Sequence, residues 1–74
     1  MIVDFMTTFD IGKAIAERRK DLQLTQAELA RLASCSNPSI IAAEAGKPTQ
    51  RIDKLLDILR VLGLTLTVTD VRRP

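Results

Sequence analysis

Apolar positions recur at helical spacing in four segments of the chain and at a spacing of two in a fifth. The first helix is predicted from Asp10, taken as its N-cap, to about Leu22, and the fourth from about Arg51 to Leu62. The buried faces of these two helices are predicted to carry Ile11, Ala14, Ile15 and Leu22 in the first, and Ile52, Leu55, Leu56, Leu59 and Leu62 in the fourth.

The stretch LTQAELARLASCSNPSIIAAEAGK lies between these helices and contains two sets of helix boundary signals. Thr25 and Glu28 form a capping-box pattern that opens a short helix. Ser36 then caps a second helix, with Pro38 in its first turn and Gly46 as its stop signal. Two short helices joined by a tight turn form a helix-turn-helix unit, whose second helix can enter the DNA major groove.

After Gly63, which is predicted to end the fourth helix, the period changes to two over residues 64–69, where Leu64, Leu66 and Val68 alternate with threonines. A lone strand leaves its backbone groups unpaired, so this segment needs a partner. We expect the same strand of a second copy, paired antiparallel across a two-fold axis; the alternative is pairing with residues 2–5 of the same chain. The predicted fold is all-α, four to five short helices in one domain (1–74), plus this C-terminal strand.

Composition and length exclude several function classes. The chain has no histidine and one cysteine, so a zinc cluster or an internal disulfide is not expected. Its acids are scattered and no glycine-rich phosphate loop occurs, so we expect neither an enzyme nor a cofactor. No apolar run reaches transmembrane length, and Asp4 interrupts the one stretch that imitates a signal peptide. The net charge of +2 is modest, and a cytoplasmic protein without a membrane partner is expected.

Three positions of the central unit sharpen the interpretation. Ala30 is small where the two helices must approach, Ser34 sits at the turn, and Ile40 is apolar on the inward side of the second helix. With the flanking ERRKDLQLTQAELA and EAGKPTQ, this spacing resembles the phage-repressor (Xre-type) helix-turn-helix family over about residues 10–69. In that family the turn position of Ser34 is commonly glycine, because the backbone there has a positive φ. Cys35 occupies a position that is usually a small aliphatic residue, so we expect it to pack as a small hydrophobe.

The ending LGLTLTVT resembles a branch of that family, the HipB-like antitoxins. The resemblance implies a homodimer that binds palindromic operator DNA, represses its own operon, and neutralises a HipA-like toxin kinase encoded beside it. Two alternatives stay open. One is a repressor-fold protein-interaction module with weak or lost sequence-specific DNA binding, and the other is a stand-alone Xre-type regulator without a toxin.

The resemblance also places the outward positions of the second helix. Asn37 is the one side chain there that can make a bidentate contact, the type suited to adenine. Ile41 and Ala42 offer apolar contact, for instance to a thymine methyl group. An alternative for Ile41 is burial beneath residues 1–8, a segment that is either a short strand or a packing arm. The predicted base-reading residues are Asn37, Ser39 and Ala42.

Phosphate contacts are expected around this helix. The predicted set is Gln26 at the start of the first helix of the pair, Ser36 at the cap of the second, and Lys47, Thr49 and Arg51 after it. The cluster Arg18–Lys20 could add positive charge for DNA binding. The alternative is a purely structural role, because Glu17 and Asp21 interleave with the cluster and cations near a helix C-terminus are favoured by its dipole.

Overall fold

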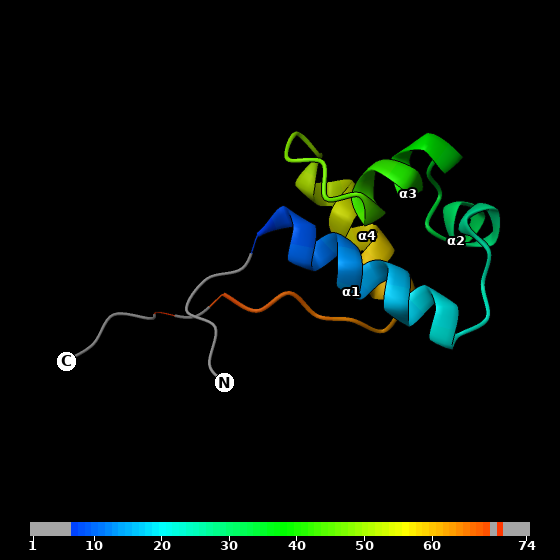
Figure 1. Ribbon diagram of the computed structural model, residues 1–74, viewed down its shortest axis with the longest axis horizontal. Coiled ribbons are helices and arrows are strands. Elements are labelled where there is room, and N and C mark those ends of the chain that lie inside the picture. Colours follow the sequence, from blue (N-terminus) through cyan, green and yellow to red (C-terminus); the bar gives the residue numbers. More distant parts are fainter. Residues whose placement is uncertain (1–6, 69, 71–74) are drawn as a thin grey trace.

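The computed structural model describes residues 7–68 and residue 70, and this part contains four α-helices. They are α1 (Thr8–Asp21), α2 (Gln26–Leu32), α3 (Asn37–Glu44) and α4 (Ile52–Val61). Figure 1 shows α1 across the lower part of the helical body and α3 above it, with α4 behind these two helices. None of the described helices is long and apolar enough to cross a membrane. The four helices of the described part confirm the prediction of four to five short helices.

The start of α1 differs from the prediction. Its N-cap is Thr7, and Asp10 is the third helical residue, so the assignment of Asp10 as N-cap was wrong. The Asp10 backbone NH donates to Thr7 Oγ1 at 3.2 Å, and the Thr7 backbone NH donates to Asp10 Oδ2 at 3.0 Å. This reciprocal capping box satisfies two amide groups instead of one. The hydrogen bond from the Thr7 backbone NH is also the main reason that the pKa of the Asp10 carboxyl group is lowered.

The buried face of α1 is also corrected. Ile15 is fully buried and Ile11 partly buried, as predicted, whereas Ala14 and Leu22 are exposed. Leu22 is exposed at the end of the helix, where it is the C-cap. Ala14 is exposed because the buried face of α1 is centred on Gly12 and Ile15. A Cβ atom at position 12 would lie only 2.6 Å from the carbonyl oxygen of Glu44. Glycine therefore allows the backbones of α1 and α3 to approach closely.

The turn between α2 and α3 has the predicted geometry. Thr25 and Glu28 form the capping box of α2, and Ser36 caps α3 through the Ser39 amide. Ser34 has a φ of +56°, the left-handed conformation expected at this position. The core beneath the turn consists of aliphatic side chains and alanines: Ile15, Leu29, Ala30, Ala33, Ile40, Ala43, Ile58, Leu59 and Leu62.

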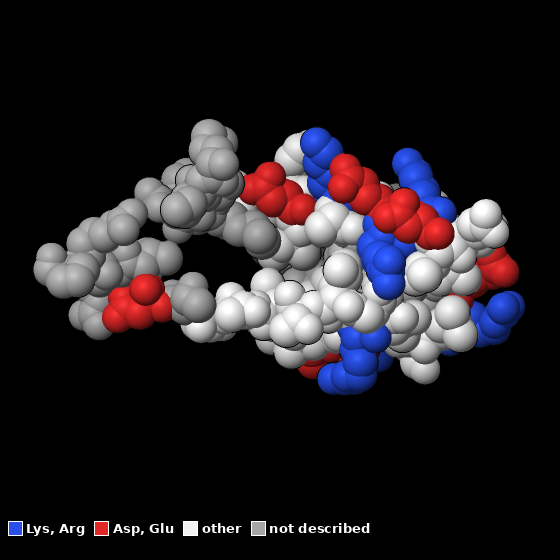
Figure 2. Space-filling view, turned by 90° about the horizontal axis from the view of Figure 1, so that it is seen from below, with Lys and Arg blue, Asp and Glu red and all other residues white. Residues whose placement is uncertain are grey.

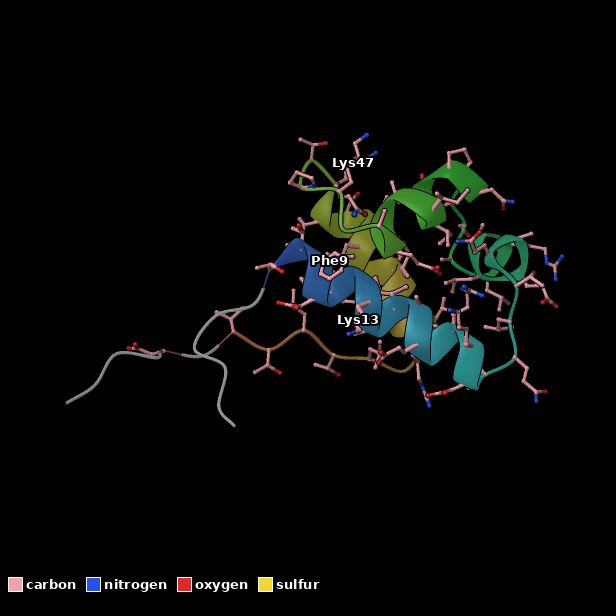
Figure 3. The ribbon with its side chains drawn as sticks, viewed as in Figure 1. Phe9, Lys13 and Lys47 are labelled. Carbon is pink, nitrogen blue, oxygen red and sulfur yellow. The ribbon has the colours of Figure 1, made fainter. Side chains whose placement is uncertain are left out.

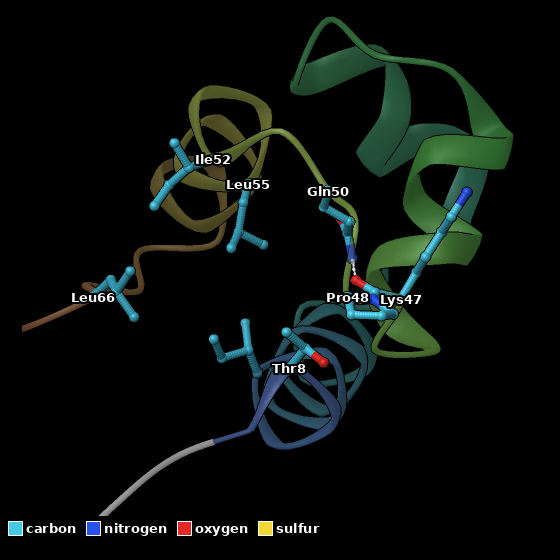
Figure 4. Close-up of a pocket in the computed structure, with 8 residues that line it drawn as sticks. Thr8, Lys47, Pro48, Gln50, Ile52, Leu55 and Leu66 are labelled. Carbon is cyan, nitrogen blue, oxygen red and sulfur yellow. Dashed lines mark hydrogen bonds between the residues drawn. The ribbon is translucent and has the colours of Figure 1, made fainter.

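The predicted stripe of α4 is correct for Leu55, Leu59 and Leu62 and wrong for Ile52 and Leu56, and Leu55 is only partly buried. Leu59 and Leu62 are buried together with Ile58, which the sequence interpretation omitted, whereas Ile52 is 64% exposed and Leu56 39% exposed. The C-terminal half of α4 reaches the core, and its N-terminal half borders an open groove of about 230 Å³ (Figure 4). Apolar side chains from α1, the segment between α3 and α4, α4 and the C-terminal segment line this groove: Ile11, Pro48, Ile52, Leu55 and Leu66.

The predicted C-terminal strand is absent from the described residues. Gly63 has a φ of +72° and ends α4 as expected, but residues 64–68 are not assigned to a strand. The physical reason is that a strand is defined by hydrogen bonds to a neighbour, and the described part of the single chain offers none. Leu64 and Leu66 pack against the core while Val68 is 93% exposed. Residues 2–5, the alternative partner, lie outside the described part.

Candidate nucleic-acid interface

Helix α3 has one buried side and one exposed side. Ile40 and Ala43 are almost fully buried, at 0% and 1% exposure. Residues three and four positions apart share a face of a helix, so the opposite side is formed by one stripe of residues. This outer stripe consists of Pro38, Ile41, Ala42 and Ala45, with Ile41 51% exposed and Ala42 partly exposed.

Polar side chains gather at the N-terminal end of α3. Asn37 is exposed, and its side chain makes no hydrogen bond within the described part of the chain. Ser36 Oγ accepts from the backbone NH of Ser39 at 3.2 Å and lies 2.9 Å from Ser39 Oγ. The two hydroxyl groups therefore hold each other, whereas the Asn37 amide is available to a ligand.

The C-terminal end of α3 is attached to α1 and α2 by a polar network. Arg19 Nε donates to Glu44 Oε2 at 2.6 Å, and a second guanidinium nitrogen donates to Glu44 Oε1 at 3.1 Å. Gln26 Nε2 donates to the same Oε1 at 3.1 Å, and Arg19 also donates to the carbonyl oxygen of Leu24. The side chains of Arg19 and Glu44 are only 12% and 9% exposed. A bidentate ion pair that is so well shielded fixes the position of α3.

The predicted phosphate-binding residues lie around α3. Lys47, Thr49 and Arg51 are exposed on the segment that follows it, and Gln50 braces that segment by donating to the carbonyl oxygens of Ala42 and Lys47. Figure 3 places Lys47 beside the end of α3, on the side away from Lys13 of α1. Lys47 forms no ion pair with the described residues, whereas Arg51 pairs with Asp53 at 2.6 Å.

The opposite side of the molecule carries mixed charge. Figure 2, which looks from the α1 side, shows lysines and arginines interspersed with acidic residues, so no patch of one sign forms there. Arg18 donates to the carbonyl oxygen of Leu62, and Arg19 belongs to the network around Glu44. These two arginines therefore connect α1 to α3 and to the end of α4, contacts that the sequence interpretation did not predict.

Several residues of this region escaped the sequence interpretation. Glu44 connects three helices through its hydrogen bonds. The sequence feature that could have indicated this role is a lone carboxylate, next to Ala43, in a helix without other charges. Lys54 has the sequence context of an ordinary solvated residue, but its ammonium group donates to the carbonyl oxygen of Ser34 and so supports the turn. Gln23 has a φ of +59°, which no feature of the sequence indicated.

Cys35 packs partly buried against the core, as predicted. Burial raises the pKa of its thiol, which keeps the thiol protonated and unreactive at neutral pH. No group of three or more potential metal ligands occurs in the described part. The region around α3 is therefore suited to binding, through an exposed helix held rigidly from behind.

A short helix presented in this way, after a tight turn and a packed preceding helix, defines a helix-turn-helix protein. A helix-turn-helix family model matches residues 15–68, most of the chain, and the protein belongs to that family of DNA-binding regulators. The chain is also 40% identical over 62 residues to an uncharacterized HTH-type transcriptional regulator, y4mF, of Sinorhizobium fredii (strain NBRC 101917 / NGR234). The match covers 84% of this chain and 82% of that relative. Both similarities indicate a regulator and not an enzyme.

Proposed function

We propose that the protein is a transcriptional repressor that inserts α3 into the major groove of operator DNA. The observation that carries this proposal is the arrangement of α3, which is fixed on its inner side and left uncovered on its outer side by the residues that the structure describes. The bidentate Arg19–Glu44 pair holds it from behind, and Asn37 and Ile41 project from its exposed part. Rigid presentation of a few side chains is what discrimination between base pairs requires.

The proposed base-reading residues remain Asn37, Ser39 and Ala42. Asn37 is exposed at the first position of the helix, where side chains come nearest to base edges. The Ser39 hydroxyl group already forms a hydrogen bond with the Ser36 hydroxyl group. It could contact a base only in addition to this bond or by giving it up. Asn37 is therefore the main hydrogen-bonding reader in this proposal.

The proposed phosphate contacts come from Gln26, Ser36, Lys47, Thr49 and Arg51. Gln26 uses one of its two amide hydrogens on Glu44, which orients the side chain and leaves the second hydrogen for a phosphate oxygen. The Lys47 ammonium group is exposed without an acidic partner in the described part. Because these groups lie around α3, they would fix its depth and direction in the groove.

The test is DNA selection from a random duplex library with the intact protein, followed by affinity measurements at increasing salt. Counterion release predicts a log–log slope of about −0.9 for each phosphate neutralised. Lys47→Ala should weaken binding to selected and random duplexes alike and make the slope shallower by about one unit. Lys13→Ala, which removes an equal charge from the α1 side, serves as the matched control and should leave the slope unchanged. Absence of binding at low salt would contradict the proposal.

We also propose that two copies associate through residues 64–69, with Leu64, Leu66 and Val68 at the interface. Val68 is 93% exposed, and Leu66 borders the open groove together with the exposed α4 residue Ile52. An exposed apolar segment with unpaired backbone groups is suited to antiparallel pairing with its copy. A two-fold dimer would place two α3 helices about 34 Å apart, one turn of DNA.

Dimer formation is tested by light scattering at micromolar concentration. Leu66→Pro should yield monomers because it removes a ladder hydrogen bond. Val68→Lys should do the same without disturbing the fold, since this side chain has no packing partner in the described part. Thr67→Lys, on the other face of the segment, is the matched control. A monomer for the unmodified protein would contradict the proposed interface.

The most specific part of the proposal is the role of antitoxin to a HipA-like toxin kinase in the cytoplasm. It rests on the resemblance of the ending LGLTLTVT to the HipB-like branch. Co-purification with the product of a neighbouring kinase-like gene, and loss of kinase activity in the complex, would support it. A neighbourhood without such a gene would favour a stand-alone regulator.

One observation favours a second candidate function, a protein-interaction module that has lost sequence-specific DNA binding. Beyond Asn37 and the Ser39 hydroxyl group at its N-terminal end, the exposed side of α3 has no hydrogen-bonding side chain, which is unusual for a base-reading surface. The salt series separates the two functions, because a module of this kind would show no salt-dependent binding to duplex DNA.

A further inference from the structure

Helix α3 is apolar on both of its sides. Ile40 and Ala43 fill the core, while the outer stripe presents Ile41 at 51% exposure together with Pro38, Ala42 and Ala45. A helix that is apolar all round is normally buried, and exposed apolar surface of this kind marks a binding site. The outer stripe therefore requires an apolar feature on whatever it binds.

The charges near this stripe favour a polyanionic partner. Glu44 is the one carboxylate of α3, and its charge is neutralised on the inner side by Arg19. Lys47 lies three residues after the last residue of the helix and is exposed. The partner must therefore combine negative charge with a small apolar group. The DNA major groove does so, because the C5-methyl group of thymine is the apolar group that it displays.

We propose that Ile41, flanked by Ala42, is a specificity-determining residue that recognises thymine by its methyl group. This inference rests on the proposed insertion of α3 into the major groove. Asn37 lies one turn before Ile41, so its amide group is placed to bind a neighbouring adenine. Discrimination then comes from one hydrogen-bonding residue and one apolar residue, without an arginine or glutamine on the outer stripe.

Deoxyuridine provides a direct test, because it pairs as thymidine does and lacks only the methyl group. A duplex selected by the intact protein is remade with deoxyuridine in place of thymidine at one position at a time. We expect affinity to fall about four-fold at the contacted position, the value for one buried methyl group, and about 15-fold when both half-sites are changed. Substitution by 5-bromodeoxyuridine, in which bromine takes the place of the methyl group, should restore binding.

The protein side of the test uses Ile41→Ala. Its affinity for the thymidine duplex should fall to about that of the unmodified protein for the deoxyuridine duplex, and it should no longer distinguish the two. Leu22→Ala removes an apolar side chain of similar exposure from the far end of α1 and should keep the full discrimination. Circular dichroism verifies that both variants fold.

The outcomes separate this inference from the proposed function. Salt-dependent binding of a selected duplex, with no loss on deoxyuridine substitution at any position, would overturn the role of Ile41 and leave the repressor proposal intact. Continued discrimination between thymidine and deoxyuridine by Ile41→Ala would overturn that role as well. Failure to select or bind any duplex at low salt would overturn both the role of Ile41 and the repressor proposal.

Discussion

The two sides of α3 both carry apolar residues, but the inner side ends in a shielded carboxylate, whereas the outer side leaves an isoleucine exposed. On the inner side, near its C-terminus, a carboxylate is 9% exposed and is held by Arg19 and Gln26. On the outer side an isoleucine is 51% exposed. The inner polar groups are fully hydrogen-bonded, so they are stable and specify one arrangement of three helices. The outer apolar groups have no partner among the described residues, which is why we propose that they contact DNA.

The largest effect is expected from breaking the inner side. Arg19→Met leaves the largely shielded Glu44 carboxylate without its cation and should lower the free energy of unfolding by up to about 3–5 kcal/mol. Urea denaturation monitored by circular dichroism measures the loss. The double variant Arg19→Met/Glu44→Leu should recover a large part of it, because the unpaired charge is gone. A loss below about 1 kcal/mol for Arg19→Met would show that the pair behaves as a surface ion pair.

The next effect concerns the close approach of α1 to α3. Gly12→Ala places a Cβ atom against the backbone of Ala43 and Glu44, and should lower the free energy of unfolding by about 1–3 kcal/mol. An exposed glycine in a helix would instead gain stability on this change. Lys13→Ala, at the neighbouring exposed position, is the control and should stay within about 0.5 kcal/mol. Stabilisation by Gly12→Ala would contradict the packing described.

A smaller effect is expected at the start of α2, which supports Gln26. Thr25→Ala removes the capping bond and should lower the free energy of unfolding by about 1 kcal/mol. The amide of Thr25 donates to Glu28 and lowers the pKa of that carboxyl group below its ordinary value of 4.5. Stability from a lowered pKa is complete above the ordinary value and is lost as the pH falls through the lowered one.

The pH dependence gives the capping prediction a second measurement. Chemical denaturation between pH 6 and pH 3 should show stability falling below about pH 4.5. In Glu28→Gln the decrease in stability at low pH should be smaller, because the contribution of Glu28 is absent. The similar capping box at Thr7 and Asp10 should keep its own contribution. An unchanged profile for Glu28→Gln would mean that the lowered pKa has no energetic role.

The smallest effect on stability is expected on the outer side of α3. Ile41→Ala should change the free energy of unfolding by about 0.5 kcal/mol or less, because the side chain is half exposed and alanine favours helices. Ile40→Ala, its fully buried neighbour, is the control and should cost about 2–5 kcal/mol. A large loss for Ile41→Ala would indicate that another part of the chain covers this residue, as in the alternative of a packing arm.

The local signals in the sequence predicted the helix-turn-helix unit well. The capping box at Thr25, the cap at Ser36 and the positive φ at Ser34 depend on a few neighbouring residues, so a sequence pattern contains them. Gly12 and Glu44 were not recognised, because their roles arise from contacts between α1 and α3 that are distant in sequence. The cap of α1 was missed for a simpler reason, since Thr7 and Asp10 were both suitable and only their reciprocal bonds decide between them.

The strand over residues 64–69 illustrates a different limit. Period two describes side-chain alternation and predicts an extended segment, but strand formation depends on a partner. A pattern within one chain does not contain the geometry of a second copy. The same holds for the outer side of α3, whose composition indicates a contact while the identity of the bound bases depends on the DNA.

The central claim is that the outer side of α3 is the DNA-binding surface. Amide chemical-shift mapping by NMR, during titration of the labelled protein with a selected duplex, tests it most directly. The account predicts the largest shifts at residues 36–47 and at the segment up to Arg51, with much smaller shifts at Lys13 and Glu17 on α1. Shifts concentrated on α1, with residues 36–47 unaffected, would contradict the account.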